Sequence, residues 1–393
     1  MENRQLTREQ LEARRATRRR HVRRRRITAL ALAVSALVGV PMLALQVTAA
    51  GAPARPTVPE PQAVERPRAT VRTPSSAASS VGRLGSGKQV TLAFGGDVHF
   101  ESPIRERLAA SPSSVLEPIA PVLSRADIAM VNLETAVTDR GEPAPKAYVF
   151  RAPASAFSAL KSGGVDLVTV ANNHGMDYGT TGLSDTLAAG KRAGVSIVGA
   201  GGNDKQAYAP HRITVKGQRI AIIGATQVLD DQLITAWTAG PGKMGLASAK
   251  DEPRLVRAVR EARETSDTVV VYVHWGVELA GCPTGFQTSL ARKLVDAGAD
   301  VVVGSHAHVL LGAGKLKRAL VAYGLGNFVF YASREETSQS GVLEVTVTGR
   351  RIDRYRWIPA RISGGIPYPS AGGSRKEAVA KWRSLRTCTD LKP

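Results

Sequence analysis

The sequence predicts an α/β protein in which buried strands alternate with helices. Short runs of β-branched and apolar residues recur along the chain, and segments of helical character separate several of them. Of the 393 residues, 43 % are hydrophobic, which is enough to bury a sizeable core. The 38 glycines and the few aromatic residues suit a fold with many tight turns after its strands.

The elements follow one another without an internal repeat. The expected strands are Val90–Phe94, Ile128–Asn132, Leu167–Val170, Arg219–Ile223, Thr268–Val273, Val301–Val303 and Leu320–Ala322. The expected helices are Asp251–Glu264 and Gln287–Ala297, and a strand pair over Val342–Val347 and Arg351–Pro359 precedes a last short helix at Arg375–Leu385. We therefore expect one large domain over residues 89–365, followed by a C-terminal extension at 366–393.

The N-terminus combines a basic flank with an apolar run. Residues 1–26 contain eleven Arg and three Glu, and the uncharged run Ile27–Val47 follows at once. About 20 apolar residues suffice to cross a hydrocarbon core of roughly 30 Å. Basic residues on one flank place that flank in the cytoplasm. We therefore predict a basic cytoplasmic segment at 1–26 and a single transmembrane signal anchor at 27–49. The alternative is a signal peptide cleaved near Val47-Thr48-Ala49 and a secreted protein.

A Pro/Ser-rich linker is predicted at residues 50–88, between the anchor and the domain. Six prolines lie between Pro53 and Pro74, and a Ser- and Gly-rich stretch follows them. Such a composition cannot build a core, so we expect a solvated spacer.

The positive charge argues against a nucleic-acid-binding protein. The formal net charge is +20, of which residues 1–26 carry +8, and the remaining +12 is spread over more than 360 residues. An even basic excess favours an acidic environment or an anionic polymer over a dedicated nucleic-acid groove. The sequence contains no nucleic-acid-binding motif.

The two cysteines, Cys282 and Cys388, do not form a CxxC pair, which excludes a zinc–thiolate site. In an exported domain they can form one disulfide. Two unpaired thiols are the alternative, and the sequence leaves both open.

Histidines mark the candidate site. Five of the seven follow directly after an apolar strand, in turns rich in Gly, Asn and Asp. The carboxyl ends of the strands in an α/β sheet form the crevice where ligands bind. Five strand ends would bring eight side chains to one edge: Asp97, His99, Glu134, Asn173, His174, His274, His306 and His308.

These side chains are suited to a pair of divalent cations. They offer carboxylate, imidazole and amide groups but no sulfur, a set that suits Mn, Fe, Zn or Mg. The ligands are too many for one ion, and they suit two ions about 3.5–4 Å apart that share a bridging carboxylate. We therefore expect two divalent metal ions as cofactors.

The order of these motifs resembles that of calcineurin-like metallophosphatases. The motifs are Asp97-x-His99, Asn173-His174, His274 and Gly304-x-His306-x-His308. In their particular forms the motifs are similar to those of CapA-type capsule proteins: Asn132-Leu133-Glu134, Ala171-Asn172-Asn173-His174-x-x-Asp177-x-Gly179, His274-Trp275-Gly276-x-Glu278 and Gly324-Leu325-Gly326-Asn327-Phe328.

The resemblance implies a fold, a set of ligands and a catalytic group. The implied fold has two packed mixed β-sheets flanked by helices. One metal would be held by Asp97, His99, Glu134 and His308, and the other by Glu134, Asn173, His274 and His306. His174 would donate a proton or stabilise an oxyanion, with Asp177 beside it as the carboxylate that orients an imidazole. Asn132 and Glu278 would support the ligands from behind.

The resemblance also implies a role in making, exporting or attaching poly-γ-glutamate or a similar anionic envelope polymer. The expected activity is a metal-dependent hydrolase or transferase acting on a phosphoester or amide bond. The expected partners are the membrane, the polymer and a polymer synthase or export complex.

Two departures from the phosphatase pattern support an alternative. Glu134 stands where phosphatases have Asp, and Gly175 follows the Asn-His pair where they have an acidic residue. In the alternative the protein is a non-catalytic, membrane-tethered accessory subunit with a structural metal.

The predicted topology can be tested by limited proteolysis. Protease added to intact protoplasts should release the domain, because the basic flank keeps only the N-terminus in the cytoplasm. The released fragment is detected by immunoblotting, with a cytoplasmic marker protein as control. A domain that is cleaved only after the cells are lysed would contradict this topology.

Overall fold

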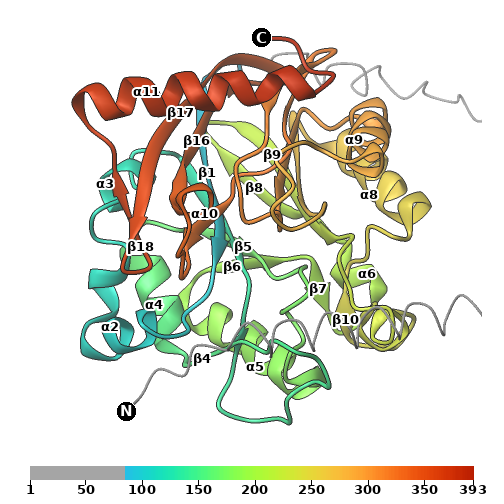
Figure 1. The fold of residues 1–393 in the computed structure, drawn as a ribbon. Coiled ribbons are helices and arrows are strands. Elements are labelled where there is room, and N and C mark those ends of the chain that lie inside the picture. The colour runs from blue at the N-terminus through green and yellow to red at the C-terminus, as the bar shows by residue number, and fades with distance from the viewer. Residues whose placement is uncertain (1–84) are drawn as a thin grey trace, which may run out of the picture. The chain divides into compact units, whose positions relative to one another are not determined.

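The computed structural model describes residues 85–393 (Figure 1). The predicted basic segment 1–26, the anchor 27–49 and most of the linker 50–88 lie outside the described residues. Within the described part, every helix is too short or too polar to span a bilayer.

The largest sheet in the described part of the chain contains eight strands. Its order is β18–β17–β16–β1–β2–β5–β6, and β15 also pairs with β1. The strands are β1 (Val90–Val98), β2 (Ile128–Leu133), β5 (Leu167–Thr169), β6 (Ser196–Val198), β15 (Asn327–Val329), β16 (Gln339–Thr348), β17 (Arg351–Ser363) and β18 (Ile366–Pro369). Strands β1, β2, β5, β6 and β15 are parallel, whereas β16, β17 and β18 extend the sheet in antiparallel pairs.

The second sheet has the order β13–β14–β12–β11–β9–β8. Its strands are β8 (His211–Val215), β9 (Gln218–Thr226), β11 (Thr268–His274), β12 (Val301–Ser305), β13 (Ala313–Leu316) and β14 (Ala319–Ala322). The four central strands are parallel, and the two edge strands are antiparallel. Two short pairs complete the strands: β3 (Ala136–Val137) with β4 (Arg151–Ala152), and β7 (Ala200–Gly201) with β10 (Gly245–Leu246).

The strands carry apolar side chains on both of their faces. Each sheet therefore packs against the other sheet on one face and against helices on the other. Leu92 and Phe94 of β1 and Val270 and Tyr272 of β11 point into the core between the sheets. Ala93 instead faces the helices on the outer side of the first sheet. The fold therefore has four layers, with a sheet pair at its centre and helices on both outer faces.

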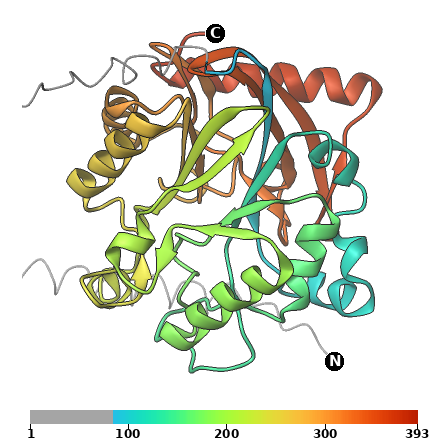
Figure 2. The same ribbon diagram turned by 180° about the vertical axis from the view of Figure 1, so that it is seen from behind.

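Figures 1 and 2 show these helices from opposite sides. The first sheet is covered by α2 (Ile104–Ala110), η2 (Pro112–Val115), α3 (Ala120–Leu123), α4 (Ser155–Ser162) and α5 (Gly179–Ala193). The second is covered by α8 (Glu252–Thr265) and α9 (Gly285–Ala297). Three further short helices are α6 (Asp204–Ala207), α7 (Ile234–Trp237) and α10 (Glu335–Ser338).

The sequence predictions for the elements are confirmed, with shifted ends. All seven expected strands are present. β1 continues four residues past its expected end at Phe94, to Val98, and β9 continues three residues past its expected end at Ile223, to Thr226. The two helices correspond to α8 and α9, and the strand pair corresponds to β16 and β17. Pairing with neighbouring strands lengthens β1 and β9, which local composition does not reveal.

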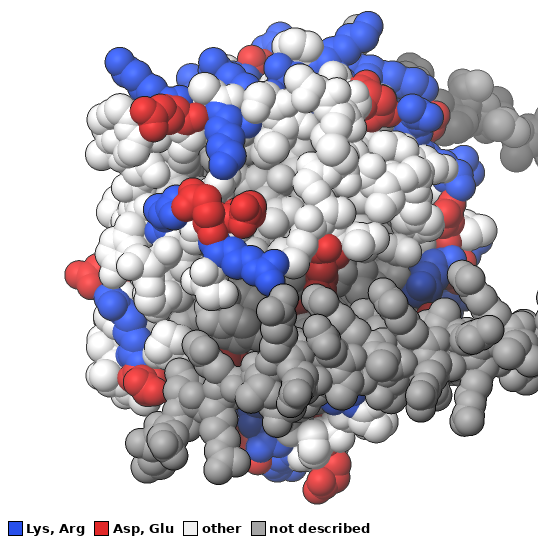
Figure 3. Space-filling model, viewed as in Figure 1, with Lys and Arg blue, Asp and Glu red and all other residues white. Residues whose placement is uncertain are grey.

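The end of the chain closes one end of the sheets. Helix α11 (Gly372–Ser384) crosses the sheets (Figure 1), and its Trp382 stacks on Trp357 of β17 with ring centroids 5.4 Å apart. η3 (Leu385–Cys388) follows it. Residues 351–393 contain ten Lys or Arg against three acidic residues. The expectation of an even basic excess is therefore wrong, and Figure 3 shows Lys and Arg side chains gathered at this end of the molecule.

Two glycines allow strands to approach closely at the edge that holds the candidate site. A Cβ on Gly96 would lie 1.9 Å from the Gly326 carbonyl oxygen, and one on Gly304 would lie 2.1 Å from the Tyr323 carbonyl oxygen. The N–H of Asp97 donates to that same Gly326 oxygen at 3.0 Å. The glycines therefore let β1 and β12 each pack closely against the segment 323–326, which connects β14 to β15.

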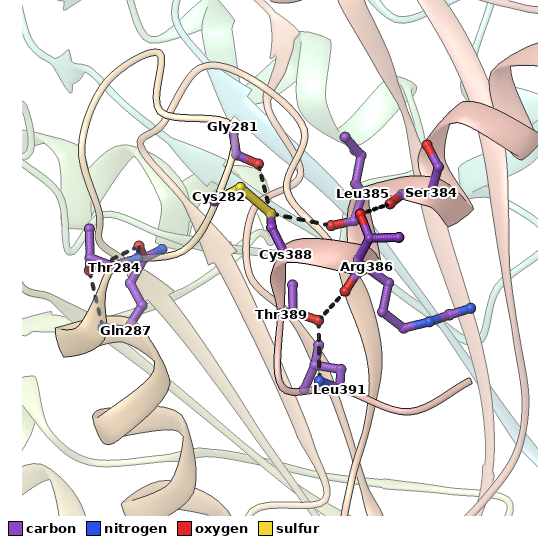
Figure 4. The surroundings of a disulfide bond; sticks show 11 residues. Gly281, Cys282, Thr284, Gln287, Ser384, Leu385, Arg386, Cys388, Thr389 and Leu391 are labelled. Atoms are coloured by element: carbon purple, nitrogen blue, oxygen red, sulfur yellow. Dashed lines mark hydrogen bonds between the residues drawn. A yellow bond between two sulfur atoms is a disulfide. The ribbon is translucent and has the colours of Figure 1, made fainter.

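The structure joins Cys282 and Cys388 by a disulfide, one of the two alternatives that the sequence leaves open (Figure 4). The bond ties the loop between β11 and α9 to η3, across 106 residues of sequence. It thereby fixes the loop that carries Glu278 to the end of the chain.

Candidate metal centre

A chain of hydrogen bonds fixes the carboxylate of Asp97 at the end of β1. Asn132 Nδ2 donates to Asp97 Oδ1 at 2.8 Å, and the N–H of His306 donates to Asp97 Oδ2 at 3.2 Å. Asn172 Nδ2 donates in turn to Asn132 Oδ1 at 2.9 Å. Asn132, predicted to support the ligands, therefore orients Asp97, and Asn172 orients Asn132.

Glu134 is the electrostatic centre of the site. Its side chain is fully buried, and neither carboxylate oxygen has a hydrogen-bond partner. Burial raises the pKa of Glu134 well above its usual range, and the negative charge of Asp97 raises it further. A buried carboxylate without a partner is unfavourable unless a proton or a cation neutralises it.

His274 lies against Glu134 at the end of β11. Its Nε2 is 3.5 Å from Glu134 Oε1 and 2.8 Å from Asn173 Oδ1. Its Nδ1 is 2.9 Å from Ser305 Oγ, which fixes the ring. Burial lowers the pKa of His274 well below its usual range, so the ring is neutral and can act as a metal ligand.

His306 and His308 lie on the strained turn that follows β12. Their φ angles are 91° and 57°, in the left-handed region that residues other than glycine rarely adopt. His306 Nδ1 is buried without a hydrogen-bond partner. His308 Nδ1 lies 2.8 Å from Asn327 Oδ1 and 3.4 Å from Asp97 Oδ2.

The two histidines differ in their protonation. Burial lowers the pKa of His306 to about 3, and the neighbouring His308 lowers it further. Burial also acts to lower the pKa of His308, but the negative charges of Glu134 and Asp97 outweigh it and raise that pKa to about 9. A proton on His308 therefore supplies positive charge beside the two carboxylates.

The site offers three overlapping sets of potential ligands. The sets are Glu134 with His274 and His306, Asp97 with Glu134 and His308, and Glu278 with His306 and His308; within each set the ligand atoms lie within 4.8 Å of one another. Glu134 is common to the first two, as a bridging carboxylate would be. Glu278 was expected to orient a histidine, and its carboxylate also lies within reach of His306 and His308.

His99 lies apart from these sets. Its ring is enclosed by Phe150, Phe330 and Tyr331, with the Phe330 ring centroid 3.9 Å away. Its Nδ1 lies 3.0 Å from the N–H nitrogen of Glu101. Burial lowers the pKa of His99 well below its usual range. The role of His99 as a metal ligand stays a prediction.

His174, Asp177 and Lys146 form a second cluster beside the ligands. His174 Nδ1 lies 2.6 Å from Asp177 Oδ2, and Lys146 Nζ lies 2.9 Å from Asp177 Oδ1. Lys146 Nζ also donates to the carbonyl oxygen of Asn173. Burial lowers the pKa of His174, although the contact with Asp177 partly opposes this shift. Asp177 is fully buried and acts on His174 from behind.

A cavity of about 560 Å³ opens onto both clusters. Asn173, His174 and His308 line it, together with Lys146 and Glu278. A substrate in this cavity would therefore contact the predicted proton donor and the ligand sets at the same time.

Sequence reasoning missed Lys146, Asn172, Ser305 and Asn327 as parts of the site. Asn172 and Asn327 stand inside the quoted motifs, and Ser305 directly precedes His306, so their positions were a usable signal. Lys146 lies in a loop between β3 and β4 that has no recognisable pattern. Only the folded chain brings it to His174.

Residues 91–332 match a family described as "Bacterial capsule synthesis protein PGA_cap". The chain belongs to this family. Two PGA_cap relatives are each 30 % identical to it. One is the capsule biosynthesis protein CapA of Bacillus anthracis, matched over 74 % of this chain and 72 % of that protein. The other is the PGA biosynthesis protein CapA of Bacillus subtilis, matched over 73 % and 76 %.

Among solved structures, a putative 5'-nucleotidase from Staphylococcus aureus in complex with alpha-ketoglutarate is similar to this PGA_cap protein. It aligns with 76 % of this chain and 58 % of its own, with 15 % sequence identity and a TM-score of 0.44.

Replacement of either histidine of the strained turn should remove metal from the PGA_cap site. His306→Ala and His308→Ala each delete a side chain from two ligand sets, so we expect the loss of about one metal equivalent without unfolding. Metal content is measured by elemental analysis and folding by circular dichroism. His211→Ala, on β8 outside the site, is the matched control. Full metal content in both variants would refute this ligand assignment.

Metal affinity should rise with pH. Below about pH 9, the pKa of His308, the imidazole holds a proton that a metal ion would have to displace. The apparent affinity for Mn²⁺ should therefore increase roughly tenfold per pH unit between pH 6 and 8 for each proton released. Calorimetric titration in buffers with different heats of ionisation counts those protons. An affinity that is constant over this range would contradict the assignment of His308.

Proposed function

We propose that this protein is an extracytoplasmic, metal-dependent hydrolase or transferase in the biosynthesis of poly-γ-glutamate or another anionic envelope polymer. The observation that carries the proposal is the buried, unpartnered carboxylate of Glu134 among histidine and carboxylate ligands. The relatives named for capsule biosynthesis and for PGA biosynthesis support the polymer.

The residues present fit a pair of divalent cations. Both oxygens of Glu134 and the Nδ1 of His306 are buried without hydrogen-bond partners, and the neighbouring donors are nitrogen and oxygen atoms. Asp97, Glu134 and His308 would hold one ion, and Glu134, His274 and His306 the other, with Asn173 beside them. A bound divalent cation supplies Lewis acidity, which polarises a phosphoryl or carbonyl oxygen and lowers the pKa of water.

His174 is the group that moves a proton. Its lowered pKa leaves the ring neutral near pH 7, with Nδ1 held against Asp177. The ring can then accept a proton through Nε2 and return it to a leaving group. Lys146 holds the carboxylate of Asp177 and the backbone of Asn173, so it keeps the His174 ring beside the ligand sets.

The packing around Gly175 supports a catalytic role over the accessory-subunit alternative. A Cβ at residue 175 would lie 2.2 Å from the carbonyl oxygen of Val170, so an acidic side chain does not fit there. Asp177 provides the carboxylate instead, 2.6 Å from His174 Nδ1. This departure from the phosphatase pattern therefore moves the acid along the chain without removing it.

The proposed location is the outer face of the cell membrane, with the domain tethered by the segment 27–49. Secretion after cleavage is the alternative. The basic surface formed by residues 351–393 suits contact with an anionic polymer. A polymer synthase or export complex is the proposed partner.

His174→Ala should separate catalysis from metal binding. Loss of a general acid or base typically lowers a rate by about 10²–10⁴-fold. We expect that loss with metal content and melting temperature unchanged, whereas His274→Ala should lose metal first. The measurement is turnover of an activated phosphodiester by full-length protein with added Mn²⁺, alongside elemental analysis.

The outcomes distinguish the candidate functions. Equal loss of metal in both variants would refute the separate role of His174. If the parent protein binds metal but turns over neither phosphodiester nor glutamyl amide substrates, the accessory-subunit alternative is favoured. The absence of metal from the parent protein would remove the basis of the proposal.

A further inference from the structure

Exposed apolar side chains gather at the mouth of the cavity. Among residues 85–393, five large hydrophobic side chains are at least 41 % exposed. Tyr148, Leu279 and Tyr331 line the mouth, and Val277 lies two residues before Leu279. The fifth, Tyr368, lies on β18. We call the first four the apolar collar. Clustered exposed hydrophobic side chains mark surfaces that contact a ligand or partner.

Three separate loops contribute to the apolar collar. Tyr148 precedes β4, Val277 and Leu279 follow β11, and Tyr331 follows β15. Leu279 has a φ of 61°, and its N–H donates to the carbonyl oxygen of Ala307 at 2.8 Å. The disulfide at Cys282 ties the same loop to η3 (Figure 4). The hydrogen bond to Ala307 and the disulfide hold Leu279 in its exposed position at the mouth of the cavity.

Basic side chains line the same cavity beside the ligand sets. Lys146 is buried there against Asp177 and Asp230, and Arg334 is exposed at the mouth. A divalent cation held by the ligand sets, with Lys146 beside it, would attract an anionic group. The apolar collar above them suits an uncharged chain attached to that group.

We propose that the cavity binds an anionic amphiphile, a phosphoryl group joined to an apolar chain, as in a lipid-linked precursor of the polymer. The phosphoryl group lies at the metal centre, and the chain leaves the cavity across the apolar collar. This inference rests on the proposed function, since the metal centre receives the anionic end.

The experiment measures how binding depends on chain length. Full-length protein loaded with Mn²⁺ is titrated calorimetrically with methyl-, butyl- and hexylphosphonate, which cannot be hydrolysed. Each methylene that becomes buried contributes about 0.8 kcal/mol, or roughly fourfold in affinity. We expect hexylphosphonate to bind at least about tenfold more tightly than methylphosphonate, because part of its chain contacts the apolar collar.

The double variant Tyr148→Ser/Leu279→Ser should bind all three probes with equal affinity. Its metal content and its affinity for methylphosphonate should match those of the parent protein. Tyr368→Ser removes an equally large exposed side chain outside the collar and should retain the full dependence on chain length. Acetate and hexanoate, tested in parallel, should bind more weakly than the phosphonates of the same chain length.

Each other result overturns the inference. If the parent protein binds all three phosphonates with equal affinity, the alkyl chain does not contact the apolar collar. In that case, binding of methylphosphonate would still agree with the proposed function. An undiminished chain-length dependence in the double variant assigns the effect to other residues. Tighter binding of the carboxylates excludes the phosphoryl group. Failure of the proposed function itself is recognised separately, as absence of bound metal.

Discussion

The buried carboxylate of Glu134, which has no hydrogen-bond partner, is the constraint around which this edge of the fold is organised. Ionising a fully buried carboxylate without a partner costs several kcal/mol, so the free energy of the site depends on what neutralises it. The protein responds with raised pKa values at Glu134 and His308. Divalent cations held by the ligand sets would displace the proton of His308 and neutralise the carboxylates. Protons and metal ions would therefore compete for this site.

The pair of packed sheets explains how the ligands are held. Asp97 lies near the end of β1 and Glu134 follows β2 in the first sheet, whereas His274 ends β11 and His306 and His308 follow β12 in the second. The ligand sets cross the boundary between the sheets, so their distances depend on how the sheets pack. The core between the sheets, with Phe94 and Tyr272, thereby fixes the metal site as well as the fold. Tyr272 links the two sheets directly, since its hydroxyl donates to the Gly95 carbonyl oxygen at 2.8 Å.

Much of the site could be predicted from the sequence because its ligands follow strands. The apolar run Thr268–Val273 predicts a strand, and His274, the next residue, is therefore predicted to lie at the end of that strand. Parallel pairing then brings the ends of neighbouring strands together. The role of Lys146 could not be predicted, because its loop contacts Asp177 only through tertiary folding. The surroundings of His99 were missed for a similar reason. Spacing places His99 on the same side as Asp97, but the aromatic rings that enclose it come from distant parts of the chain.

The strained backbone conformations lie in loops at the strand ends, whereas the layered sheets and helices supply the stability. His306, His308 and Leu279 all adopt left-handed backbone conformations, each of which costs about 1–3 kcal/mol for a residue other than glycine. These residues persist there because their neighbours hold them: the N–H of His306 binds Asp97, and that of Leu279 binds Ala307. The layered sheets and helices supply the stability that offsets this strain. If these loops adopted unstrained conformations, the strain would be lost but the histidines would no longer surround Glu134. The strained conformations of His306 and His308 are therefore needed to hold these histidines around Glu134.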